Sequence, residues 1–275
     1  MKKVAIAGAN GFIGKALQED FRHTVILHRD DTVEMLREKL IDVDMVINLA
    51  GAPIIKRWSG DYKKTLVQSR IETTAKLVEA MDGSDVAYFI SASAIGIYPN
   101  DAKCDERCDM FGEDFLSTLC REWEAEALKC PKPTAILRLG VVLGKGGALS
   151  KMLVPFKLGL GGIIGDGKMM TSWISLDDLK RIFHFLYEHK AQGVFNAVSP
   201  HPVSNKIFTQ ALGKALHRPT ILPLPIWVLK MIYGEAASVL IDSKEIYPQR
   251  LIEMGFVFHH PNIEEALEKI VNENI

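Results

Sequence analysis

The chain has 275 residues, a length that allows one large domain or one domain with an added lobe. Hydrophobic residues make up 48% of the chain and charged residues 24%, which is ordinary for a globular protein and excludes a disordered or collagen-like chain. The 33 basic and 34 acidic side chains leave a formal charge of −1, so no bulk positive field favours binding to nucleic acid or to an anionic membrane.

Short apolar runs alternate with amphipathic stretches through the first half of the chain. The apolar runs predict strands at residues 3–7, 24–27, 45–49, 86–91 and 134–139. The amphipathic stretches predict helices at residues 12–21, 32–40, 61–81 and 114–128. Apolar strands separated by helices indicate a sheet covered on both faces, so we expect an α/β fold with a Rossmann-type doubly wound parallel sheet.

The second half has fewer signals of this kind. Ser175, followed three residues later by Asp178, predicts the start of a helix that runs through Tyr187. A short strand is expected at residues 193–197, and Ser204 is placed to begin another helix. Three prolines at positions 219, 223 and 225 then precede a mostly helical end of the chain.

No segment of the sequence predicts a membrane anchor or an export signal. The apolar stretch at residues 221–233 is interrupted by Pro223 and Pro225 and is too short to span a bilayer. The apolar run after Lys3 ends at Gly8, which is too early for the apolar region of a signal peptide. The four cysteines include no Cys-x-x-Cys pair, so we expect reduced thiols in a cytoplasmic protein.

The strongest local signal is a glycine-rich segment that follows the first predicted strand and opens the first predicted helix. Gly8 permits a tight turn, Gly11 lets the backbone approach a pyrophosphate, and Gly14 lets the helix pack close to the strand. The N-terminus of the helix then offers N–H groups and a positive dipole end to the phosphates. The predicted dinucleotide-binding segment comprises Gly8, Asn10, Gly11, Phe12, Ile13 and Gly14.

The end of the second predicted strand indicates which dinucleotide binds. Enzymes that use NAD usually place an acid there for the ribose 2′-hydroxyl, whereas this chain has Arg29. A guanidinium can bind a 2′-phosphate through charge-assisted hydrogen bonds, so the sequence favours NADP(H). The alternative is that Arg29 is a solvated surface charge and that Asp30, the next residue, binds the ribose of NAD.

These signals divide the chain into two parts. We assign residues 1–160 to an NAD(P)-binding Rossmann domain. Residues 161–275 are expected to form a smaller, mostly helical substrate lobe, with residues 175–197 returning to the Rossmann core.

Further motifs point to a known family. Asn48-Leu-Ala-Gly51 follows the third predicted strand and Ser91-Ala-Ser-Ala94 follows the fourth, with Leu137-Arg-Leu-Gly-Val-Val-Leu-Gly144 and Ser172-Trp-Ile174 further along. With the glycine segment, these motifs resemble the extended short-chain dehydrogenase/reductase superfamily. The closest resemblance is to its atypical, epimerase-like branch with a small C-terminal domain, whose bacterial members are labelled nucleotide-sugar epimerase-like or cell division inhibitor. The resemblance covers nearly the whole chain.

The resemblance implies cofactor contacts beyond the glycine segment and Arg29. These additional residues are Leu49, Ala50, Gly51, Ser91, Ala92 and Arg138. Arg57 and Arg70 also carry charges that suit a phosphate or carboxylate of a substrate, although an internal salt bridge is the alternative for Arg70.

The sequence departs from the superfamily at its catalytic pair. The superfamily uses Tyr-x-x-x-Lys, but the matching positions here hold Cys120 and Glu124, and a glutamate cannot replace the positive charge of the lysine. Ser93 matches the catalytic hydroxyl that orients a substrate oxygen, and its alternative is a strand-end serine bonded to its own backbone. Tyr98 is the nearest phenol that could act as a substitute acid, and a turn aromatic is the alternative.

Two classes of function remain open from the sequence. The first is an NADP(H)-dependent oxidoreductase or epimerase acting on a small substrate, with sugar nucleotides among the candidates. The second is a catalytically weak NADP(H)-binding sensor or regulatory protein, which the missing tyrosine and lysine favour. We expect no metal site, because His259-His260 and the Cys104 to Cys108 spacing do not match a metal-binding geometry. The oligomeric state, monomer or homodimer, is left open.

Overall fold

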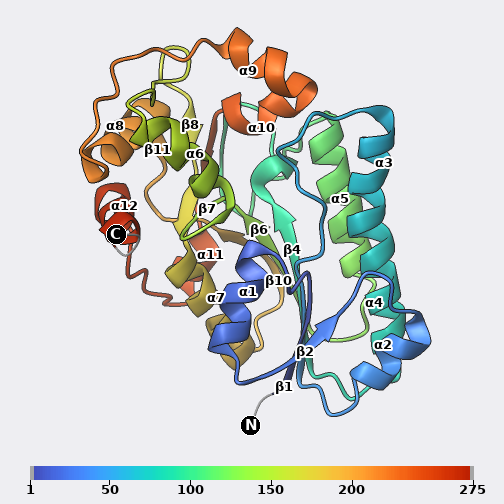
Figure 1. The fold of residues 1–275 in the computed structure, drawn as a ribbon. Coiled ribbons are helices and arrows are strands. Elements are labelled where there is room, and N and C mark those ends of the chain that lie inside the picture. Colours follow the sequence, from blue (N-terminus) through green and yellow to red (C-terminus); the bar gives the residue numbers. More distant parts are fainter. Residues whose placement is uncertain (1–2, 273–275) are drawn as a thin grey trace.

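Six parallel strands form the central sheet of the computed structural model, which describes residues 3–272 (Figure 1). Each strand is hydrogen-bonded in parallel to its neighbours. In spatial order the strands are β2 (His23–Leu27), β1 (Lys3–Ala7), β3 (Met45–Asn48), β4 (Tyr88–Ala94), β6 (Thr134–Leu139) and β10 (Gly193–Ala197). The predicted doubly wound parallel sheet is therefore confirmed. Its topological switch point lies between β1 and β3, which are neighbours in the sheet but not consecutive strands in the chain.

Helices cover both faces of this sheet, as Figure 1 shows. Alternate residues of β1 point to opposite faces: Val4 and Ile6 join one apolar cluster, and Ala5 and Ala7 join the other. The first cluster includes side chains of α1 (Phe12–Asp20) and α7 (Leu176–His189). The second includes side chains of α2 (Val33–Lys39), α4 (Thr73–Met81) and α5 (Phe115–Ala127).

The single helix predicted at residues 61–81 is interrupted in the structure. It consists of α3 (Gly60–Val67), a π-helical turn at Gln68–Glu72, and α4. Side chains support the wider turn: Ser69 Oγ accepts a hydrogen bond from the N–H of Ala52 at 2.9 Å, and Thr74 Oγ1 donates to the carbonyl of Arg70 at 2.6 Å. Such turns arise where a side chain competes with the helical ladder, and they often lie at functional sites.

The remaining elements form the smaller part of the molecule. Three two-stranded sheets pair β5 (Ala102–Cys104) with β12 (Lys244–Ile246), β7 (Val141–Leu143) with β9 (Trp173–Ser175), and β8 (Met170–Thr171) with β11 (Val203–Ser204). The helices are α6 (Gly147–Lys157), α8 (Asn205–Ala215), α9 (Ile226–Tyr233), α10 (Ser238–Ile241), α11 (Gln249–Glu253) and α12 (Ile263–Asn272). Short 3₁₀ turns occur at Ile95–Ile97 and Gly234–Ala237.

Several contacts join this part to the sheet domain, and two of them involve the chain after β3. Arg57, in the loop after β3, donates to the carbonyl of Met231 at 2.9 Å, and Lys63 pairs with Glu235 at 2.6 Å. Strand β10 and helix α7 belong to the main sheet and its cover although they follow residue 161, because β10 pairs with β6.

Local helix signals were predicted accurately where a side chain caps the backbone. Ser175 Oγ accepts the N–H of Asp178 at 3.0 Å and begins α7, and Ser204 Oγ accepts the N–H of Ile207 at 3.3 Å and begins α8. Gly255 follows the end of α11 with a φ of +83°, a left-handed conformation that favours glycine.

The cysteines differ from the expectation of four reduced thiols. Cys104 and Cys108 are joined in a disulfide, while Cys120 and Cys130 are free and buried. Between residues 3 and 272, no cluster of histidine, cysteine, aspartate and glutamate side chains is arranged to hold a metal ion. Over the same range, no helix is both long and apolar enough to cross a membrane.

Candidate functional site

A pocket of about 260 Å³ opens at the carboxyl ends of β1, β2 and β3, where parallel α/β sheets usually bind their ligands. We call it the switch-point pocket. Its walls come from the glycine segment, the last residues of β2, the chain after β3 and the inner face of α4. The lining residues include Gly8, Asn10, Arg29, Ala50, Gly51, Ala52, Ser69, Thr73 and Lys76.

The turn after β1 requires glycine because larger residues would clash with the neighbouring backbone. Gly8 has a φ of +81°, and a Cβ atom there would lie 2.6 Å from the carbonyl oxygen of Leu49. A Cβ on Gly14 would lie 2.3 Å from the carbonyl oxygen of Gly8. Gly11 is the N-cap of α1 and provides no side-chain cap, so the first N–H groups of α1 have no side-chain partner there and can meet an anion.

Positive charge dominates the rim of the switch-point pocket. Arg29, just after β2, is exposed and lines the pocket, and Lys76 of α4 lines it as well. Neither cation pairs with a carboxylate within residues 3–272. The two cations are therefore available to a phosphate in the pocket.

The one carboxylate that lines the switch-point pocket is already neutralised. Asp31 is buried, accepts the N–H of His28 at 2.7 Å, and pairs with Lys39 at 2.5 Å. Burial raises the pKa of Asp31, but the hydrogen bonds from Lys39 and from the N–H of His28, together with the charge of Lys39, outweigh burial and hold the pKa below the ordinary value. Asp30, the alternative ribose ligand, is exposed and does not line the pocket.

A buried polar network lies at the carboxyl ends of β4 and β6. Ser93 donates to Glu124 Oε1 at 2.6 Å, and Arg138 donates to both oxygens of Glu124 at 2.8 Å. Arg138 also donates to the hydroxyl of Tyr98 at 2.8 Å, which in turn donates to Asn196 Oδ1 at 3.0 Å. All five side chains are buried, so each charge and polar atom depends on the others for compensation.

This network limits what the candidate catalytic residues can do. The proton of Ser93 is committed to Glu124, which leaves the serine oxygen as a hydrogen-bond acceptor. Tyr98 is fully buried, and burial raises its pKa. Burial, together with the charge of Glu124, raises the pKa of Cys120 to about 12. At neutral pH the Cys120 thiol is therefore protonated, and neither Cys120 nor Tyr98 faces the switch-point pocket.

The structure separates the predicted cofactor residues into two groups. Gly8, Asn10, Arg29, Ala50 and Gly51 line the switch-point pocket. The others lie outside its lining: Gly11, Phe12, Ile13, Gly14, Leu49, Ser91, Ala92 and Arg138.

Three residues of this second group have partners of their own. Arg138 is held in the buried network instead of facing the pocket. Ser91 accepts a hydrogen bond from the side chain of Asn48 at 3.3 Å. The ring of Phe12 packs beneath the glycines of residues 144–147, so that glycine cluster covers the start of α1.

Sequence reasoning missed the contribution of the helix after β3. Ser69, Thr73 and Lys76 all line the switch-point pocket. Their spacing of four and then three residues places them on one helix face, a signal that was present in the sequence. The role of Glu124 as the partner of Ser93 and Arg138 had no such signal, because these residues come from three different elements.

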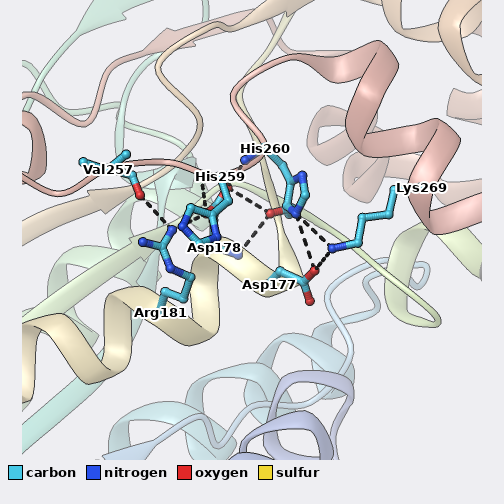
Figure 2. Close-up of polar contacts among 8 residues, drawn as sticks. Asp177, Asp178, Arg181, Val257, His259, His260 and Lys269 are labelled. Carbon is cyan, nitrogen blue, oxygen red and sulfur yellow. Dashed lines mark hydrogen bonds and ion pairs between the residues drawn. The ribbon is translucent and has the colours of Figure 1, made fainter.

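A second cavity of about 390 Å³ lies between α1, α7 and α12, and Figure 2 shows the polar contacts at its edge. Asp178 accepts the backbone N–H groups of His259 and His260 at 2.8 Å each. Asp177 pairs with Lys269 at 2.7 Å and lies 3.6 Å from the ring of His260. These contacts attach the segment before α12 to the start of α7, so the two histidines take part in packing.

Comparison with known proteins agrees with this geometry. Residues 4–198 match the NAD dependent epimerase/dehydratase family, and residues 224–270 match a domain of unknown function, DUF1731. An epimerase family protein of Mycobacterium bovis, Mb2239, is 40% identical over 96% of both chains. An epimerase family protein SDR39U1 homolog, chloroplastic, from Arabidopsis thaliana is 34% identical over 98% of this chain and 86% of its own length.

A solved structure gives the same result. The human epimerase family protein SDR39U1 (isoform 2), crystallised with NADPH, superposes with a TM-score of 0.91 at 33% identity, over 99% of this chain and 100% of the human chain. The family match spans most of the chain, including the glycine segment and all six strands of the central sheet except Lys3 at the start of β1. This protein is therefore a member of the NAD dependent epimerase/dehydratase family.

Proposed function

We propose that this protein binds NADP(H) at the switch-point pocket and acts as an oxidoreductase or epimerase on a small-molecule substrate. One observation carries the cofactor assignment: Arg29 and Lys76 flank the pocket, while its only lining carboxylate, Asp31, is occupied by Lys39. A 2′-phosphate would meet two cations there and no free acid. The relative crystallised with NADPH supports the same choice.

The residues present fit such a cofactor. Glycine at positions 8 and 14 lets the turn after β1 pack tightly against its neighbouring backbone, and the uncapped start of α1 suits a pyrophosphate. When bound, NADPH supplies a hydride to a carbonyl carbon, and NADP⁺ accepts one from an alcohol carbon.

Ser93 is the residue that we assign to the substrate. It lies near the carboxyl end of β4, the strand next to β3, and Glu124 and Arg138 hold its hydroxyl in one orientation. Because the Ser93 hydroxyl donates its proton to Glu124, its oxygen is left to accept a hydrogen bond from a hydroxyl of the substrate. The balancing proton then goes to, or comes from, water or the substrate itself, because the Tyr98 hydroxyl is bonded to Asn196 and Arg138, and the Cys120 thiol has a pKa of about 12.

The buried state of Tyr98 and Cys120 favours a second candidate, an NADP(H)-binding protein of low turnover that acts as a sensor. The two candidates share the cofactor and differ in chemistry. Fluorescence titration with NADPH and NADH tests the shared part, and we expect tighter binding of NADPH. Screening a metabolite library for NADPH oxidation tests the catalytic part. Tight NADPH binding without turnover of any alcohol, carbonyl or sugar nucleotide would favour the sensor.

A further inference from the structure

Arg70 occupies an unusual position on the π-helical turn that interrupts the helix after β3. Its guanidinium donates to the carbonyl of Ala52 at 3.1 Å and to the carbonyl of Leu66 at 3.4 Å. The guanidinium carbon lies 5.3 Å from the centre of the Trp123 ring, a cation–π contact. A Cβ atom on Gly51 would lie 3.0 Å from the guanidinium, so the glycine is what allows this close approach.

The charge of Arg70 has no anionic partner among residues 3–272. Arg138 pairs with Glu124 and Arg181 pairs with Asp178, whereas the guanidinium of Arg250, like that of Arg70, donates to backbone carbonyls. Burial lowers the pKa of Arg70. A cation taken largely out of water without a counter-charge is costly, and an anionic ligand would relieve that cost. The side chain is only partly buried, so a ligand can reach it.

The surroundings of Arg70 indicate which ligand that is. On one side, Gly51 and Ala52 line the switch-point pocket. On the other side, Trp123 and Cys120 belong to α5, and Cys120 packs in the same apolar cluster as Ala94 at the end of β4. The guanidinium therefore lies between the pocket and the strand end that carries Ser93.

We propose that Arg70 binds oxygen atoms of the nicotinamide half of NADPH, its ribose and the adjacent phosphate. In this position it supplies a positive charge from the helix after β3, whereas the buried charge on α5, Glu124, is negative and is paired with Arg138. The inference rests on the NADPH binding proposed above, and it does not require turnover.

A purely structural role for Arg70 makes a different prediction. If the side chain only satisfied the carbonyls of Ala52 and Leu66 and stacked on Trp123, its removal would lower stability and affect all ligands of the pocket alike. If it binds the nicotinamide half, its removal affects only ligands that contain that half. The fragment 2′,5′-ADP keeps the adenosine, the 2′-phosphate and one phosphate of NADPH and lacks the rest, so it separates the two cases.

The experiment compares the wild-type protein with Arg70→Met, which keeps the length and apolar stem of the side chain. Arg121→Met is the matched control, because Arg121 is an exposed arginine on α5 whose guanidinium donates to Thr118 and pairs with no carboxylate among residues 3–272. Dissociation constants for NADPH and 2′,5′-ADP are measured by fluorescence and calorimetric titration, and folding is checked by circular dichroism. We expect Arg70→Met to weaken NADPH about tenfold or more and 2′,5′-ADP less than about twofold. Arg121→Met should leave both unchanged.

Unchanged NADPH affinity in Arg70→Met, or an equal loss for both ligands, would overturn the inference while leaving the proposed cofactor intact. Failure of the wild-type protein to bind NADPH would overturn the proposed cofactor and this inference together. If Arg70→Met does not fold, Arg70→Lys keeps the charge but loses the planar fork, and a selective loss of NADPH affinity is expected from it as well. An unselective result with Arg70→Lys would count against the inference in the same way.

Discussion

Glu124 and Arg138 form a bidentate ion pair inside the protein, with two hydrogen bonds of 2.8 Å and side chains that are 8% and 5% exposed. The pair joins α5 to β6 and aligns Ser93, which donates to the same carboxylate. A buried pair of this kind contributes little net stability compared with apolar residues, but loss of one partner leaves a buried charge without compensation. We therefore expect the stability of the fold to fall when one partner is replaced and to fall less when both partners are replaced together.

Glu124→Leu should destabilise the fold by about 3–5 kcal/mol, because it leaves Arg138 buried without its carboxylate. Urea unfolding followed by circular dichroism measures this change. The double variant Glu124→Leu/Arg138→Met should recover a large part of the loss, since it removes both charges. A double variant as unstable as the sum of the two single variants would contradict the coupling.

Arg29→Glu should reverse or abolish the preference for NADPH over NADH. It replaces a cation at the rim of the switch-point pocket with an acid, and one charge-assisted hydrogen bond is worth about 1.5–3 kcal/mol, or roughly tenfold or more in affinity. Arg22→Glu, an exposed arginine just before β2 at the other end of that strand, is the control and should keep the preference. Equal affinities of the wild-type protein for the two cofactors would contradict the assignment.

Asp31→Asn should lower stability in a pH-dependent way. The folded-state pKa of Asp31 lies below its ordinary value of about 3.9, so its contribution is complete above that value and is lost as the pH falls through the folded pKa. The difference in unfolding free energy between wild type and variant, measured in urea at several pH values, should be on the order of 1 kcal/mol near neutrality and should shrink below about pH 4. If the difference in unfolding free energy instead grew as the pH falls, the ion pair between Asp31 and Lys39 would not be its source.

Ser93→Ala should lower the turnover number by about 10²–10³ once a substrate is found, because one preorganised hydrogen bond to the substrate is lost. NADPH affinity should change little. Cys120→Ala is the comparison: its thiol, with a pKa of about 12, is protonated and buried, so turnover should persist. Full activity of Ser93→Ala, or loss of activity in Cys120→Ala with intact NADPH binding, would mean that the catalytic residue is a different one.

Local features of this protein could be predicted from its sequence because they depend on neighbouring residues. The strand at residues 3–7 follows from its apolar run, and the start of α7 follows from the cap that Ser175 provides. The glycine segment predicted the switch-point pocket because only glycine fits at Gly8 and Gly14. Arg29 was placed at the pocket rim because parallel strands end at the same edge of a sheet.

The pairing of distant side chains was decided by the tertiary structure alone. Ser93, Glu124 and Arg138 meet because α5 packs beside β4 and β6, and nothing near any of them in the sequence indicates that contact. Arg70 approaches Gly51 from a π-helical turn, a distortion that helical periodicity does not reveal. Sequence pattern thus determined the sheet and the position of its ligand edge through local conformational preference and burial. Packing between elements far apart in the chain decided which charges are free at that edge and which are paired in the interior.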